Sequence, residues 1–252
     1  MANLGEMVAE LLHELAPRYI EGTAVTQYML FLMGSIVLTA VFFFIVARKV
    51  ALVPKGIGNI GEMGVEFVRN NIVVDVMGQE GIKYLPFVVT IFFAVLFNNF
   101  VGLIPGMKPG TGTLGTTLTW GLIVFVVYNA IGFRKNGFIG YLKSFLPSGT
   151  PLFLAPFIYL LEVISHFLRP FTLCVRLYAN MYAGHIVLGV FAIFVDIAIH
   201  NLSAVSIVVG TMSLGMQIIM YAFEVFVAFI QAYVFAILTA VYISGALHAK
   251  EH

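Results

Sequence analysis

The chain has 252 residues, of which 61% are hydrophobic and only 10% are charged, and its mean hydropathy is +1.01. Soluble globular proteins are usually about 45–50% apolar and about 25% charged, so this composition excludes a soluble domain and indicates a polytopic membrane protein. A net charge of +1 gives no sign of the basic surface that nucleic-acid binding requires. The single cysteine, Cys174, excludes an intrachain disulfide and any cysteine-based metal site.

The first half of the chain predicts an outer segment, three membrane spans and one helix that lies in the membrane interface. Residues 1–24 are polar, partly amphipathic and without the basic region of a signal peptide. We expect spans over 25–47, 84–104 and 117–133, because each is an apolar run long enough to cross a bilayer. Residues 57–74 place apolar side chains at helical spacing against a charged side, which suits an interfacial helix; a soluble connecting helix is the alternative.

Two adjacent amides, Asn98 and Asn99, lie near the end of the second predicted span. Buried amides either join helices by hydrogen bonds or line an aqueous channel, and the sequence leaves both interpretations open. The loop that follows, over 106–117, is rich in Gly, Thr and Pro.

The second half of the chain consists of two very long apolar runs, 151–195 and 204–247. As straight helices they would each be about 65 Å long, whereas the hydrocarbon core is only about 30 Å thick. We therefore predict two long helices that are strongly tilted or bent and packed as a hairpin, with Pro156 and Pro170 permitting kinks in the first. A short polar link is expected to connect them, formed by Asp196, His200, Asn201 and Ser203.

These elements predict an all-α fold in a single membrane domain over 1–252, with about five membrane helices. The first three spans fall within 25–147 and the long hairpin within 151–247. With the N-terminus outside, only Arg18 and Lys108 lie on the outer side. The remaining loop cations fall inside, as the positive-inside rule requires, and they place the C-terminus in the cytoplasm. They are Arg48, Lys49, Lys55, Arg69, Lys83, Arg134, Lys135, Lys143 and Lys250.

Arg176 lies in the middle of the first long run, where a charge is costly. A charged side chain at bilayer mid-depth costs about 2.5–3.5 kcal/mol on insertion scales, and arginine cannot escape by losing its proton. Arg176 must therefore face a protein interior, a water-filled cavity or a partner carboxylate; a structural ion pair is the simplest alternative.

Helical spacing groups the other polar residues of this run. Five of them share roughly one helical face: Glu162, His166, Arg169, Arg176 and Asn180. His185 points the other way, which suggests two aqueous environments rather than one continuous pore. Arg169 is either part of this stripe or an interfacial, snorkelling residue, and His166 is either a relay or a packing histidine.

The second long run has a polar stripe of its own. Gln217, Glu224 and Gln231 are seven residues apart and align on one face. Glu224 is the only acid in this run, and a lone buried carboxylate is protonated or paired, with His185 or Arg176 as the partner. Gln217 either belongs to the path or forms an interhelical hydrogen bond. Titratable side chains, amides and a permanent cation together indicate proton-relay chemistry.

Two other classes of membrane protein fit less well. A secondary ion transporter would show paired halves with broken helices, and no such symmetry is visible. A membrane enzyme would need a nucleophile and base or metal ligands, and neither HExxH nor GxSxG occurs in the chain.

The hairpin contains the string VRLYANMYAGH at 175–185, preceded by PLFLAPFIYLLEVISHFLRP and followed by FEVFVAFIQAYVFAILTAVYISGALHAKEH. Together these resemble subunit a of the rotary F-type ATP synthase. The resemblance covers the whole chain in length and span order and is strongest over 155–247. The IPG that ends the second span and the VPKGIGNIGE that begins the interfacial helix also fit.

The resemblance implies roles for individual residues. Arg176 matches the family's essential arginine, which faces the ion-binding carboxylate of the rotating c-ring, and Asn180 and Gln231 match amides near it. Glu162 matches an acidic position toward the cytoplasmic half-channel. His185 and Glu224 match a paired site in the other half-channel.

This chain departs from the family pattern at two places. Some relatives carry the acid first and the histidine second, whereas here the order is His185 then Glu224, and this exchange predicts contact between the two side chains across the hairpin. Some relatives have an acid where this chain has Gly102, so the outer entrance would rely on water, Asn98, Asn99 and His200.

The resemblance also implies the setting of the protein. It would be a non-catalytic proton channel of the stator, without cofactor or metal, that couples proton flow to ATP synthesis or hydrolysis. Its partners would be the c-ring, the b-type subunits of the peripheral stalk, the rest of the complex and membrane lipid. The expected location is the bacterial plasma membrane, with an energy-transducing organelle membrane as the alternative.

Overall fold

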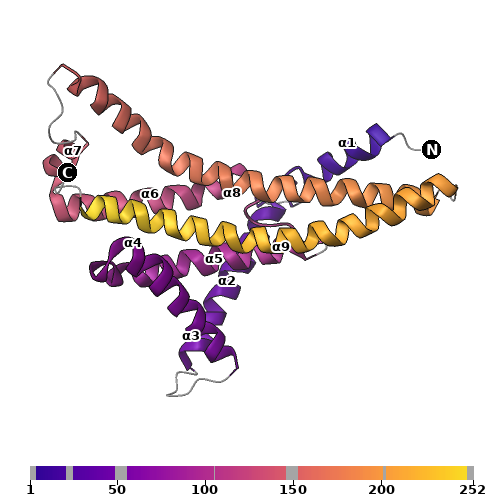
Figure 1. Cartoon of the computed structure of the whole chain (residues 1–252), viewed down its shortest axis with the longest axis horizontal. Helices are drawn as coiled ribbons and strands as arrows, with labels where there is room; N and C mark the ends of the chain where they lie inside the picture. The colour runs from indigo at the N-terminus through magenta and orange to yellow at the C-terminus, as the bar shows by residue number, and fades with distance from the viewer. Residues whose placement is uncertain are drawn as a thin grey trace.

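The computed structural model describes residues 4–20, 25–48, 56–104, 106–145, 153–200 and 203–248. It is a bundle of helices arranged around two very long ones (Figure 1). In chain order the α-helices are α1 Leu4–Leu15, α2 Gln27–Arg48, α3 Ile57–Val68, α4 Asp75–Met77, α5 Leu85–Leu103, α6 Leu114–Asn136, α7 Phe138–Lys143, α8 Ala155–His200 and α9 Ala204–Leu247. A π-helical segment, Arg69–Val74, joins α3 to α4, and a 3-10 helix, Gln79–Tyr84, leads into α5.

Five helical stretches are long and apolar enough to cross a membrane. They are Gln27–Arg48, Gln79–Leu103, Leu114–Asn136, Ala155–His200 and Ala204–Leu247. The predicted all-α membrane fold with five spans and a final long hairpin is therefore confirmed. The division of the chain into the segments 1–24, 25–147 and 151–247 remains a prediction.

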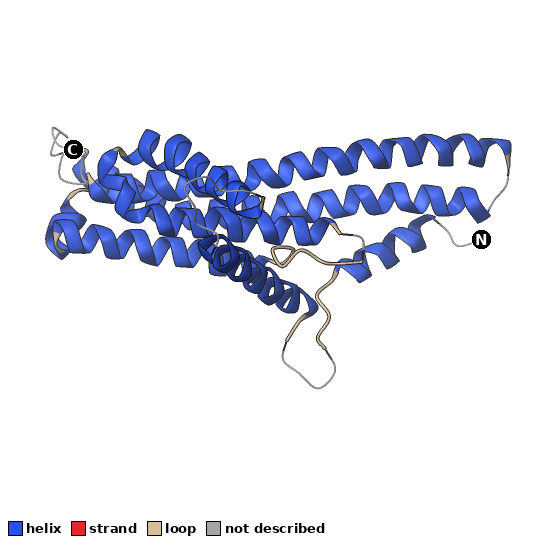
Figure 2. Cartoon of the chain, turned by 90° about the horizontal axis from the view of Figure 1, so that it is seen from below, coloured by secondary structure: helices blue, strands red, loops and turns tan. Residues whose placement is uncertain are grey.

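The hairpin of α8 and α9 is the longest feature of the molecule, and the two helices run side by side in both views (Figures 1 and 2). Small residues permit this closeness: a β-carbon added to Gly210 of α9 would lie 2.2 Å from the β-carbon of Ala198 in α8. Toward its amino end α8 diverges from α9 (Figure 1), and the helix contains Pro170 in its interior. Helix α6 packs against both long helices.

The polar link between the long helices is shorter than predicted. Helix α8 continues through Asp196 and ends at His200, so these two residues form its last turn instead of a loop. The His200 imidazole lies 3.4 Å from the Asp196 carboxylate and 3.0 Å from its carbonyl oxygen. A pair of this kind four residues apart supports a helical turn, which explains why polar residues did not end the helix.

The core lies where α5 and the carboxy-terminal half of α9 pack together. Phe235 and Ile243 of α9 and Val88 and Val95 of α5 are fully buried. The buried share of the α8 span is much smaller than that of the α5 or α9 span. One side of α8 therefore has no neighbour within the described chain.

The predicted interfacial helix over 57–74 is present as α3 and the π-helical segment. Its carboxy-terminal apolar residues, Val68 and Ile72, are fully buried against the bundle. Ile60 and Met63 are 62% exposed, so part of the apolar stripe points outward. Exposed apolar side chains are compatible with lipid contact, and the interfacial position remains a prediction.

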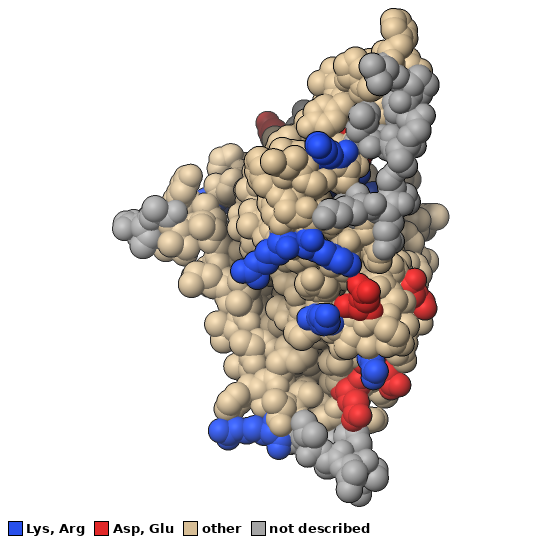
Figure 3. Space-filling model, turned by 90° about the vertical axis from the view of Figure 1, so that its left-hand side faces the viewer, with Lys and Arg blue, Asp and Glu red and all other residues tan. Residues whose placement is uncertain are grey.

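Charged side chains gather at the end of the molecule that holds α7 and the end of α9 (Figure 3). Lys83, Arg134 and Lys135 line one depression there with Leu247, the last residue of α9. Helix α1 lies at the opposite end (Figure 1). Several residues named in the sequence predictions lie outside the described ranges: Lys49, Lys55, Lys250 and Asn201.

The close approach of α6 and α8 generates a stability prediction. A β-carbon on Gly121 would lie 2.8 Å from the backbone oxygen of Pro170, which cannot move aside as a side chain can. We expect Gly121→Val to lower the free energy of unfolding by about 1–3 kcal/mol, measured as a lower melting temperature of the purified complex. The control is Gly115→Val in the same helix, where an added β-carbon meets nothing within 4 Å. Equal losses in both variants would contradict the packing argument.

Candidate functional site

Arg176 lies on the exposed side of α8. No hydrogen bond or ion pair joins its guanidinium to another residue in the described ranges. The same helix exposes large apolar side chains around it, among them Leu168 and Phe171, at 49% and 51%. A permanent cation on an apolar helix surface is costly in a bilayer unless a partner neutralises it. The alternative for Arg176, a structural ion pair within the chain, is not formed with any residue that the structure describes.

Asn180 and Gln231 join the two long helices one turn from Arg176. The side-chain amide of Asn180 donates to the Gln231 oxygen over 3.4 Å. Gln231 is buried, and no described residue accepts from its own amide nitrogen. The two amides that the sequence assigned to separate helices are therefore brought together next to the arginine.

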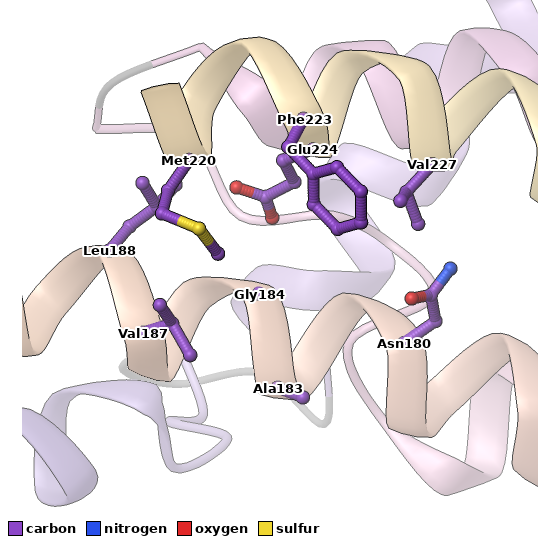
Figure 4. Close-up of a pocket in the computed structure, with 9 residues that line it drawn as sticks. All are labelled: Asn180, Ala183, Gly184, Val187, Leu188, Met220, Phe223, Glu224 and Val227. Atoms are coloured by element: carbon purple, nitrogen blue, oxygen red, sulfur yellow. The ribbon is translucent and has the colours of Figure 1, made fainter. Parts of the chain in front are cut away.

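Glu224 is buried at 5% exposure in the face of α9 that meets α8. It lines a cavity of about 190 Å³ between the helices with Asn180, Gly184 and Met220 (Figure 4). Neither carboxylate oxygen has a hydrogen-bond partner among the described residues. A buried carboxyl group without a fixed partner, beside a cavity, is able to take up and release a proton.

Gly184 makes room for this carboxyl group. A β-carbon at Gly184 would lie 2.4 Å from Glu224 Oε1, so any side chain at this position would displace the acid. This role of Gly184 was not predicted from the sequence, although the residue directly precedes His185 in a segment otherwise made of larger residues. The signal was a glycine in a helix interior, which is destabilising unless another group needs the space.

His185 lines a second cavity, of about 340 Å³, together with Gln217 and Tyr221. Its Nε2 atom is buried and has no partner in the part of the chain that the structure describes. No hydrogen bond or ion pair joins His185 to Glu224, so the direct contact predicted across the hairpin is not observed. The physical reason is the rotation of α8, which presents Gly184 to Glu224 and turns the next residue toward another cavity.

Glu162 and Arg169 form an ion pair on the half-exposed side of α8, with 2.6 Å between the carboxylate and guanidinium atoms. The Arg169 guanidinium carbon lies 5.9 Å from the centre of the Tyr242 ring. The sequence placed both residues on one helical face but did not predict the pair. Their seven-residue spacing, two turns of helix, was the signal.

His166 is buried in an aromatic cluster between α6, α7 and α8. Its Nε2 lies 2.9 Å from the Asn129 side-chain oxygen, and the rings of Phe125, Tyr128 and Phe145 pack around it. Burial raises the pKa of the nearby Tyr141, in α7, to about 12. This environment favours the packing interpretation of His166 over the relay.

Asn98 and Asn99 form the centre of a buried polar network. Ser35 of α2 and the backbone amide of Gly110 both donate to the Asn98 oxygen over 3.1 Å. The Asn99 side chain accepts from Thr111 over 3.3 Å and donates to the carbonyl of Ala228, one turn past Glu224, over 3.3 Å. These contacts favour the first interpretation, in which the amides join helices.

A comparison with known protein families shows to which family the chain belongs. The sequence model of the family described as "ATP synthase A chain" matches residues 27–244. The chain belongs to this family. The match begins at the first residue of α2 and includes nearly all of α9, so it covers the five long helices and leaves out α1.

Individual relatives agree with the family match. ATP synthase subunit a of Acidiphilium cryptum is 40% identical over 229 residues, which cover 91% of this chain and 89% of the relative. ATP synthase subunit a of Brucella canis is 40% identical over 223 residues, which cover 88% of each chain. The family predicted from the sequence is confirmed: the chain is a membrane-spanning, non-catalytic subunit of the ATP synthase complex that serves proton transport in its stator.

The position of Gly184 generates a prediction about activity. We expect Gly184→Ala to displace the Glu224 carboxyl group and to lower ATP-driven proton pumping by about 10- to 100-fold, because a misplacement of about 1 Å can cost that much. Pumping is measured in vesicles that contain the whole complex.

The matched control is Gly215→Ala in α9, where an added β-carbon meets nothing within 4 Å. Its pumping rate should equal that of the parent. A normal rate in Gly184→Ala would show that the position of the Glu224 carboxyl group does not limit pumping.

Proposed function

We propose that α8 and α9 provide two offset aqueous half-channels that load and unload the carboxylates of a rotating c-ring. One half-channel contains His185 and Glu224 and opens to the outer side. The other contains Glu162 and opens to the cytoplasm. Arg176, with Asn180 and Gln231 beside it, separates the two.

The observation that carries this proposal is that Arg176 is exposed on a largely apolar helix surface and has no ion-pair partner among the described residues. No other described helix covers the surface of α8 around Arg176. An apolar partner surface that carries one carboxylate would bury this side of α8 and neutralise the arginine. A carboxylate that approaches Arg176 is attracted in its ionised form and releases its proton. The same fixed charge repels protons and prevents a direct leak between the two half-channels.

The separation of the titratable groups supports two half-channels rather than one pore. His185 and Glu224 border cavities near the α1 end of the hairpin, whereas Glu162 lies toward the α7 end, beyond Arg176. A proton that enters beside Glu224 therefore meets the arginine before it can reach Glu162. It can pass only on a carrier that moves around this barrier, which is the role of the c-ring carboxylate.

The orientation of the chain belongs to the same proposal. The C-terminus lies in the cytoplasm and the N-terminus outside, because the α7 end gathers Lys83, Arg134 and Lys135. The membrane is the bacterial plasma membrane, because the relatives named above are bacterial proteins. Besides the c-ring, b-type stalk subunits hold the chain against rotation. Each proton gains about 2.3 kcal/mol per 100 mV of membrane potential.

Replacing the arginine tests the barrier. In vesicles with the whole complex, Arg176→Ala should abolish ATP-driven proton pumping but leave a passive proton leak through the membrane sector, because the barrier and the partner of the carboxylate are removed together. Arg18→Ala, which removes an arginine outside the long helices, should pump normally. Unchanged coupled pumping in Arg176→Ala would overturn the proposal.

Replacing Glu224 tests the proton path, and it should lower the passive proton flux where replacing Arg176 leaves a leak. Glu224→Gln keeps the size and the hydrogen-bonding capacity of the side chain but cannot carry a proton. We expect passive proton flux to fall by about 100-fold, a typical effect of removing a proton-transfer group. A leak like that of Arg176→Ala would contradict the assignment of Glu224 to the path.

A further inference from the structure

The cavity beside His185 has a wall that the family match does not include. Helix α1 contributes Leu11 and Leu15, the loop after α5 contributes Met107, and the long helices contribute His185, Gln217 and Tyr221. The family model begins at residue 27, so α1 lies outside the part of the chain that it matches. Figures 1 and 2 show α1 at the end of the molecule where the hairpin turns.

Helix α1 is packed against α8 by an apolar contact. A β-carbon on Gly189 of α8 would lie 2.6 Å from Leu11 Cδ1, so the leucine occupies the space that the glycine leaves free. Gly189 is one turn from His185. The contact between Leu11 and Gly189 therefore closes one side of the cavity beside His185, one helical turn further along α8.

The carboxy-terminal end of α1 is capped by two residues from elsewhere in the chain. The Lys108 ammonium group donates a hydrogen bond to the carbonyl oxygen of Glu14, and the Tyr28 hydroxyl donates to that of Leu15 over 2.7 Å. The last carbonyls of a helix lack partners within the helix and carry a partial negative charge, so a cation is favourable there. Lys108 Nζ also lies 5.5 Å from the centre of the Tyr28 ring.

The surroundings of Lys108 are those of a fixed group rather than a free surface lysine. Burial lowers the pKa of Lys108, and the nearby Arg18 lowers it further. Tyr28, beneath it, is 2% exposed. Lys108 is partly exposed, but its ammonium group is bonded to the carboxyl end of α1 and holds that helix end in place.

We propose that α1 is a wall of the outer aqueous route to His185, and that Lys108 is the positioning residue that holds this wall closed. The proposal rests on the proposed function, because it takes His185 to lie in the outer half-channel. It adds that the route passes through the cavity under α1 and that the loop cation controls the width of its entrance. The charge itself moves no proton.

The route is tested by blocking the cavity. Ala192 lines it two turns beyond His185, and Cys174, the native cysteine, is buried. In vesicles whose outer surface faces the medium, Ala192→Cys in the whole complex is treated with a membrane-impermeant cationic methanethiosulfonate. We expect labelling to remove most of the passive proton flux of that sample. Ile199→Cys, on the same side of α8 but not lining the cavity, should be labelled without loss of flux.

The wall is tested by the rate of labelling at Ala192→Cys. Lys108→Gln removes the charged hydrogen bond to α1 and should raise this rate by about tenfold, the factor that such a bond contributes to an opening equilibrium. Lys108→Arg retains the charge and should restore the parent rate. Deletion of residues 4–15 should match or exceed the effect of Lys108→Gln.

The outcomes separate this inference from the proposed function. Full labelling of Ala192→Cys without loss of flux, while Glu224→Gln still blocks flux, would overturn the route under α1 and leave the half-channels intact. Equal labelling rates in the parent, in Lys108→Gln and in the deletion variant would overturn the role of α1 and Lys108. Normal flux in Glu224→Gln would instead refute the proposed function.

Discussion

The close approach of α8 and α9 is the constraint on which the rest of the structure depends. Two helices can hold polar side chains at fixed positions between them only where small residues let their backbones come together. Gly210 against Ala198 provides this near the turn of the hairpin, and Gly184 provides the space for the Glu224 carboxyl group. A larger residue at either place would move the helices apart or expel the acid. The chemistry of the site is therefore a consequence of packing.

One helix presents its two arginines to different surroundings. Arg169 is neutralised within the chain by Glu162, so it adds little net charge to the surface of α8. Arg176, two turns further on, has no such partner in the described structure, although it lies on a helix that is mostly uncovered. The difference in pairing distinguishes a cation that is neutralised within the chain from one that remains available to another molecule.

The polar groups of the amino-terminal half hold together the helices around this site. Asn98 ties α2 and the loop after α5 together, and Asn99 continues the network to the backbone of α9 at Ala228. Buried amides with several partners fix the relative position of helices more specifically than apolar contacts do, because their hydrogen bonds have preferred directions. The register of α9 beside Glu224 is thereby linked to the loop after α5, which also carries Lys108.

The sequence by itself determined the membrane class, the five spans, the long hairpin and the family, because length, apolar runs and a specific motif are local properties of the chain. It also singled out Arg176 and Glu224, since charges in apolar runs are costly wherever they lie. Only the tertiary structure decided which residues meet. It separated His185 from Glu224, paired Glu162 with Arg169, enclosed His166 in an aromatic cluster and extended α8 through His200. Helical spacing assigns a residue to a face, but contact with a distant residue depends on the rotation and register of both helices, which packing alone sets.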